Sequence, residues 1–276
     1  MSETELQDTG RRAMDLYRQE ANFTRALRQP VALSLALLAS IVVIHIGVWA
    51  LDTTLRAAGG QTGPALYHGA KINLLVLEGG QWWRLVSATF LHGGLLHLAF
   101  NAYALFILAP LLERLYGSRR FMLIYMVSGL GGSAASLFFN QGVSVGASGA
   151  IFGLLGALLV FGLKFRADLP SQLRSTFGPK LIPWVVVNLV IGFIPGLNID
   201  NAAHTGGLIS GILVAAGISS ALRERPKGLS AAALEVSFVL CFILIALGLV
   251  LMVEQVMLCA GGGEFASCYP ASVLGQ

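Results

Sequence analysis

Residues 121–163 form a run of 43 positions without a single Asp, Glu, Lys or Arg. A transmembrane helix needs about 20 apolar residues, so this run is long enough for two crossings. Asn140, Gln141 and Gly142 mark the place where the two would separate. Only 12% of the 276 residues are charged, whereas a typical soluble domain is about one quarter charged. The chain is therefore predicted to be an integral membrane protein, not a soluble domain or a disordered chain.

Similar apolar runs predict seven transmembrane helices in an all-α polytopic fold. The expected spans are 29–51, 85–112 with its helix starting near residue 95, 121–139, 147–163, 181–199 with interruptions at Pro183 and at Pro195-Gly196, 201–222 and 236–253. The expected organisation is a polar N-terminal segment at 1–30, a six-helix core at 31–222 with a long outer loop at 52–92, a loop and seventh helix at 223–258, and a tail at 259–276.

The basic residues predict the orientation of these spans. If successive loops alternate between the two sides, 15 of the 18 Lys and Arg lie on the side of the N-terminus, and three lie in loop 52–92. Basic residues concentrate in cytoplasmic loops, so we expect a cytoplasmic N-terminus and an outer tail in the cell (inner or plasma) membrane. This bias also explains the net charge of +4, and no nucleic-acid partner is expected. Trp82 and Trp83 favour a loop that dips into the outer membrane interface.

Polar side chains inside the predicted spans mark candidate functional positions. His97 and Asn101 lie four residues apart and share one helix face, with His92 shortly before them. They indicate either a functional site or hydrogen bonds between helices that only hold the bundle together.

Ser148 begins the fourth predicted span, within the sequence Gly146-Ala147-Ser148-Gly149. Taken alone, such a serine fits close helix packing as well as catalysis. In the sixth span, His204, Gly207 and Gly211 share one stripe, which would let another helix approach closely. Ser148 and His204 both fall at the outer ends of their spans, so they could meet near the outer surface.

Together these motifs resemble the rhomboid family of intramembrane serine proteases over residues 82–222, about half of the chain. The resemblance rests on ordered motifs, namely Trp82-Trp83-Arg84, His92-x4-His97-x3-Asn101, Glu113 with Gly117, Gly146-Ala147-Ser148-Gly149 and Ala203-His204-x2-Gly207-x3-Gly211.

The resemblance implies a serine-type endopeptidase that cleaves single-pass transmembrane proteins near the outer membrane face. It implies Ser148 as nucleophile and His204 as general base, with His97 and Asn101 stabilising the oxyanion. It further implies a supporting role for four residues around the site, Gly146, Phe152, Gly207 and Gly211. Transmembrane-helix substrates and the lipid bilayer would be the partners, with no cofactor and no metal, and the oligomeric state stays open.

Asp200, four residues before His204, has two interpretations. It could be the acid of a triad or the N-cap of the sixth helix, and its place directly before that helix favours the cap.

Two alternative functions predict other sequence features. A non-catalytic rhomboid-like protein that binds membrane helices would lack Ser148 or His204, and both are present. A transporter or channel would spread its polar residues through the bilayer and often carries internal repeats, and neither pattern is found here.

Two of the three cysteines, Cys259 and Cys268, fall in the predicted outer tail, where thiols oxidise. Gly261-Gly262-Gly263 between them would let the chain fold back. We expect a Cys259–Cys268 disulfide that orders the tail without assisting catalysis, the alternatives being two free thiols or an intermolecular bridge.

Overall fold

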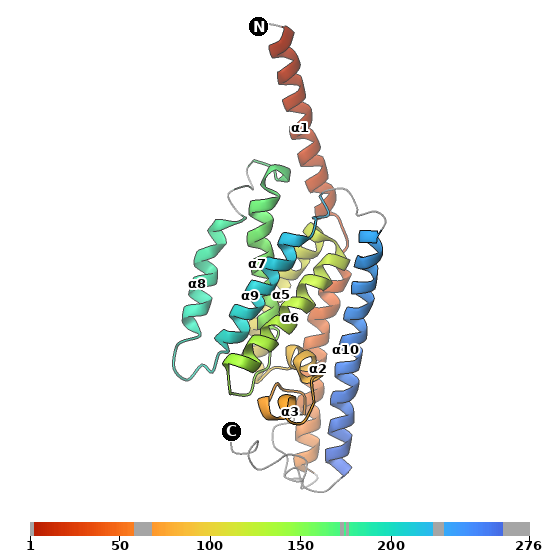
Figure 1. Ribbon diagram of the computed structural model, residues 1–276, viewed down its shortest axis with the longest axis vertical. Coiled ribbons are helices and arrows are strands. Elements are labelled where there is room, and N and C mark those ends of the chain that lie inside the picture. Colours follow the sequence, from red (N-terminus) through yellow and green to blue (C-terminus); the bar gives the residue numbers. More distant parts are fainter. Residues whose placement is uncertain (1–2, 58–67, 172–173, 175–176, 223–228, 262–276) are drawn as a thin grey trace.

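The computed structural model describes residues 3–57, 68–171, 174, 177–222 and 229–261, and all named elements in these ranges are helices (Figure 1). The long helices are α1 Glu3–Leu27, α2 Ala32–Ala57, α5 Leu95–Tyr116, α6 Ser118–Phe139, α7 Ser148–Lys164, α8 Ile182–Ile191, α9 Asn201–Gly217 and α10 Leu229–Gly261. The short ones are α3 Asn73–Leu77, α4 Arg84–Ser87, η2 Ala88–Phe90, η3 Arg166–Asp168 and η4 Pro179–Leu181. The predicted all-α fold is confirmed.

Four helical stretches of the described chain, which contain α2, α5, α6 and α10, are long and apolar enough to cross a membrane. The protein is therefore a multi-pass membrane protein. Helices α7 and α9 have 17 residues each, or about 26 Å at 1.5 Å per residue. The count of seven crossings and their orientation stay predictions.

The predicted fifth span, 181–199, is longer than the helix found there. Helix α8 has only 10 residues and ends at Ile191, which gives about 15 Å of helix against a hydrocarbon core of about 30 Å. The chain continues as turns through Gly196, whose φ of +89° is disfavoured for residues with a side chain. Pro195 and Gly196, which interrupt the predicted span, lie in these turns, but the helix already ends before them at Ile191.

The polar segment 1–30 contains a helix that its composition did not predict. Helix α1 extends from the bundle at the end opposite to α3 (Figure 1). Phe23 and Ala26, near its C-terminal end, are buried, and Arg174 donates a hydrogen bond to Gln19 at 3.3 Å.

Helices α6, α7 and α9 make the most extensive contacts in the described bundle and form its centre. Glycine permits this close helix packing because its lack of a side chain lets one helix backbone lie directly against another. A Cβ on Gly132 of α6 would lie 2.7 Å from the Ala203 carbonyl oxygen of α9. A Cβ on Gly156 of α7 would lie 2.6 Å from the Leu208 oxygen, also of α9.

Helix α10 packs along α4 and α6, at the edge of the bundle opposite to α8 (Figure 1). A Cβ on Gly248 would lie 3.1 Å from Val86 of α4, so this helix directly supports the outer loop. At its other end, Glu235 forms an ion pair with Arg119 of α6.

The described part of the outer loop, 68–92, is compact and folds around a buried arginine. Arg84 donates to the Ala70 carbonyl at 2.9 Å and to Gln81 at 2.6 Å, and its guanidinium lies 4.8 Å from the Trp83 ring centre. Trp82 of this loop is 54% exposed, as a side chain seated in a membrane interface would be.

Glu113, at the end of α5, connects two other parts of the fold. Its carboxylate accepts hydrogen bonds from the Ser34 backbone N–H at 2.8 Å and from the Ser118 hydroxyl at 2.7 Å. The first bond reaches the N-terminal turn of α2, where a negative charge is favourable.

The expected Cys259–Cys268 disulfide lies outside the described residues, because Cys268 and the Cys259 side chain are not among the described groups.

Candidate active site

Ser148 is the first residue of α7 and is half-buried. The preceding turn depends on Gly146, whose φ is +124° and whose N–H donates to the Ala88 carbonyl at 2.9 Å. A Cβ on Gly146 would lie 2.7 Å from Nε2 of His97. Conformation and space therefore both require glycine two residues before Ser148.

The first turn of α7 presents backbone N–H groups toward the loop that precedes it. The first N–H groups of a helix have no partner within the helix, and the helix dipole adds partial positive charge at this end. Ala147, the N-cap residue, makes no side-chain capping bond. The N–H of Ser148 is therefore suited to bind a developing negative charge.

His204 lies in the first turn of α9 and is buried. Its ring stacks on Phe152 of α7, with ring centroids 4.2 Å apart and planes inclined by 16°. Phe152 follows Ser148 by one helical turn. Among the described residues, Nδ1 of His204 has no hydrogen-bond partner.

Asp200 is the N-cap of α9. Its Oδ1 accepts the Ala203 backbone N–H at 3.0 Å, and its backbone carbonyl accepts the His204 N–H at 3.1 Å. No hydrogen bond between the described side chains joins Asp200 to His204. Of the two interpretations of Asp200, the geometry therefore favours the N-cap over the acid of a triad.

Backbone contacts bring the turns of Ser148 and His204 together. A Cβ on Gly149, the residue after Ser148, would lie 3.3 Å from the carbonyl oxygen of Ala203, the residue before His204. Further along, a Cβ on Gly207 would overlap the Gly149 carbonyl, and one on Gly211 would overlap the Gly153 carbonyl. These glycines set the spacing between α7 and α9.

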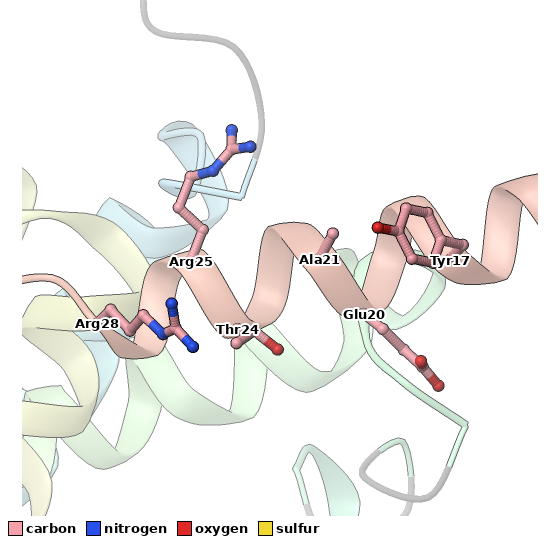
Figure 2. A pocket seen from close by; sticks show the side chains of 6 residues that line it. All are labelled: Tyr17, Glu20, Ala21, Thr24, Arg25 and Arg28. Carbon is pink, nitrogen blue, oxygen red and sulfur yellow. The ribbon is translucent and has the colours of Figure 1, made fainter.

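A small cavity of about 10 Å³ lies beside Ser148, which is room for about one water molecule. It is lined by Ala88, Thr89, Gly129, Ser133, Ser144, Val145, Gly146, Ser148, Gly149 and Ala203. Three serines and a threonine make this cavity polar. A larger hollow of about 400 Å³ lies on α1, far along the chain from Ser148, and its lining residues include no serine or histidine (Figure 2).

His97 and Asn101 lie at the N-terminal part of α5. His97 borders Gly146, as described above, and its Nδ1 accepts the Gly93 N–H at 3.4 Å. Asn101 is buried, and its Nδ2 donates to the His97 carbonyl at 2.9 Å. His92 packs edge-to-face on His97, with ring centroids 5.2 Å apart. The structure thus places His97 against the turn that leads to Ser148, and Asn101 one turn further along α5.

The rhomboid-domain family model matches residues 79–221, more than half of the chain. The protein therefore belongs to the rhomboid family, as the motifs predicted.

Three relatives illustrate the similarity. "Rhomboid protease GluP" of Bacillus subtilis (strain 168) is 45% identical over 166 residues, which are 59% of this chain and 32% of GluP. "RHOMBOID-like protein 6, mitochondrial" of Arabidopsis thaliana is 42% identical over 137 residues, which are 49% of this chain and 43% of that protein. "RHOMBOID-like protein 2" of Arabidopsis thaliana is 33% identical over 218 residues, which are 71% of this chain and 66% of that protein. The match to each of the first two covers less than half of that relative's length.

Sequence reasoning missed one group of buried polar residues near the site. Lys71 and Asn73 of the outer loop contact the end of α6 and the loop that follows it. In the sequence, Lys71 stands out only as one of three basic residues in loop 52–92. Its predicted place on the outer side, where basic residues are scarce, is the signal that points to it.

Proposed function

We propose that this protein is an intramembrane serine endopeptidase that cleaves single-pass transmembrane proteins near the outer membrane face. Ser148 is the nucleophile and His204 the general base. The observation that carries the proposal is the backbone contact between Gly149 and Ala203, which draws together the turns bearing these two side chains. The membership in the rhomboid family and the similarity to GluP, a rhomboid protease, support the same class.

The chemistry follows from the two side chains. A serine hydroxyl is a weak nucleophile until a neighbouring base accepts its proton, and neutral imidazole can do so. As Ser148 Oγ attacks the peptide carbonyl, His204 takes the proton and then gives it to the leaving amine. Water, activated by the same imidazole, releases the acyl group from Ser148. The polar cavity beside Ser148 provides room for about one such water.

The oxyanion formed in each step needs donors that are already in place. The Ser148 N–H at the start of α7 is one donor. His97 supplies a second through Nε2, the atom that borders Gly146. Asn101 can supply a third, because its amide carries two hydrogens and the bond to the His97 carbonyl uses one.

The membrane position of the dyad constrains its substrates. Both residues lie in the first turn of their helices, at the end of the bundle where the outer loop lies, and the charge distribution predicts that this end faces outward. A substrate helix has its backbone groups paired within itself, so cleavage requires local unwinding. We therefore expect substrates with helix-weakening residues near the outer end of their transmembrane segment.

The direct test is labelling with a fluorophosphonate probe together with cleavage of a model transmembrane substrate in vesicles. Wild-type protein is expected to be labelled and to cleave, and Ser148→Ala to do neither while keeping the thermal stability of the wild type. Ser133→Ala, a neighbouring serine of the same cavity, is the matched control and should still be labelled. Proteolysis by purified Ser148→Ala would refute the assignment.

His97→Ala and Asn101→Ala are expected to lower kcat with little change in KM, because oxyanion donors act mainly in the transition state. Loss of one such donor typically costs about 100-fold in kcat or more. Steady-state kinetics on the model substrate measure both constants. A fall in thermal stability with unchanged activity per folded molecule would instead assign both side chains to packing alone.

A further inference from the structure

Lys71 is a lysine whose side chain is completely buried on the outer side of the bundle. Its Nζ donates to Asn73 Oδ1 at 2.8 Å and to the carbonyl oxygens of Gly142 at 2.8 Å, Asn140 at 2.9 Å and Ser136 at 3.4 Å. Its backbone also pairs with Ser144 in both directions, at 3.0 and 3.1 Å. An ammonium group taken out of water is costly unless it is fully hydrogen-bonded and balanced by a negative charge.

Asp200 provides that negative charge, and Ser136 bridges the two groups. The buried Ser136 accepts from Lys71 through its carbonyl and donates its hydroxyl to Oδ2 of Asp200. Burial alone would raise the pKa of Asp200, but hydrogen bonds from Ser136, Ser144, the Ala203 N–H and Asn140 hold it below its usual value. Burial lowers the pKa of Lys71 to about 8, and the Asp200 charge opposes this shift. The carboxylate stays ionised at neutral pH, and its charge favours the charged form of Lys71.

We call Lys71, Asn73, Ser136, Asn140, Ser144 and Asp200 the outer polar cluster. It connects four segments that are distant in sequence, which are the outer loop, the C-terminal end of α6, the loop between α6 and α7, and the N-terminus of α9. Ser144 lies four residues before Ser148, and Asp200 lies four residues before His204. Each catalytic residue is therefore attached by a short piece of chain to the same cluster.

We infer that Lys71 and Asp200 are positioning residues for catalysis, which hold the Ser148 turn and the His204 turn in register through the outer polar cluster. This inference rests on the proposed function. Neither side chain touches the reacting atoms. Like the acid of a triad, the cluster sets the placement of the base. It does so through the backbone that precedes Ser148 and the backbone that precedes His204. A displacement of about 1 Å between nucleophile and base can cost about 100-fold in rate.

The test compares Lys71→Met, Asp200→Asn and the double variant in the full-length protein. Asparagine is as good an N-cap as aspartate, so Asp200→Asn removes the charge and keeps the cap. Three quantities are measured, which are kcat and KM on the model substrate, the rate of fluorophosphonate labelling of Ser148, and the melting temperature. The labelling rate matters because the probe reports on the dyad without any need to unwind a substrate helix.

Each single variant is expected to lower kcat and the labelling rate by roughly 10- to 100-fold, with KM changed by less than about threefold. The double variant should be about as impaired as the worse single variant, because residues that act as one unit are not additive. Lys164→Met is the matched control. Lys164 also joins α7 to α9 through carbonyl oxygens, those of Ala216 and Ile218 at 2.6 and 2.7 Å, but at the opposite end of both helices. It should lower the melting temperature and leave kcat and labelling near wild type.

Wild-type kcat and labelling in Asp200→Asn and Lys71→Met would overturn the inference. So would a lower melting temperature with unchanged kcat per folded molecule, which is the signature of a purely structural cluster. Ser148→Ala in the same assay separates the two proposals. If it loses activity while the cluster variants keep theirs, only the positioning role fails, and if it keeps activity, the proposed dyad fails.

Discussion

His204→Ala is expected to reduce substrate cleavage by about 10⁴-fold or more, because a serine hydroxyl without a general base is a poor nucleophile at neutral pH. Fluorophosphonate labelling of Ser148 should disappear with it. The substitution removes a group needed for the chemical step, so the variant should still bind the intact substrate.

The alanine variant also removes a ring that stacks on Phe152 at 4.2 Å, so its stability has to be controlled. His204→Phe retains an aromatic ring against Phe152 and removes the base. Both variants should be inactive, and His204→Phe should melt closer to the wild type than His204→Ala does. Appreciable cleavage by His204→Phe would exclude His204 as the base.

Gly207→Val is expected both to destabilise the bundle and to abolish cleavage. A Cβ at this position overlaps the carbonyl oxygen of Gly149, which is backbone and cannot rotate away. Overpacking of a tight core costs about 1–3 kcal/mol, and more when backbone has to move. The helices α7 and α9 would separate where Ser148 and His204 have to meet. Thermal unfolding and the cleavage assay measure the two effects.

Gly211→Val should act in the same way through its overlap with Gly153, one turn further from the dyad. Gly217→Val is the matched control in the same helix, because a Cβ added there meets no atom of another described segment within 4 Å. It should keep its stability and its activity. Full activity in Gly207→Val would mean that the α7–α9 contact does not set the geometry of the site.

The membrane class, the family and most helices could be predicted from the sequence, for local reasons. A run of about 20 residues without charges can pair all of its backbone groups within itself in a bilayer only as a helix. The start of α5 at Leu95 was predictable because His92, Gly93 and Gly94 interrupt the apolar pattern just before it. The rhomboid motifs are likewise short pieces of sequence in a set order.

Helix lengths were predicted less well where apolarity continues past the end of a helix. The segment after Ile191 remains apolar but folds into turns, so α8 is about half as long as expected. Conversely, α1 is a helix in a segment that composition described only as polar. Hydropathy reports which residues avoid water, and it does not report where a helix ends inside an apolar region.

The sequence by itself determined that Ser148 and His204 are present and predicted that they lie at matching depths, and the tertiary structure decided what surrounds them. Lys71 and Asp200 are 129 positions apart, and nothing in the pattern around either residue refers to the other. Their connection exists because α6 and α9 pack backbone to backbone and the outer loop closes over their ends. Such a cluster depends on which distant segments meet, so only the folded chain reveals it.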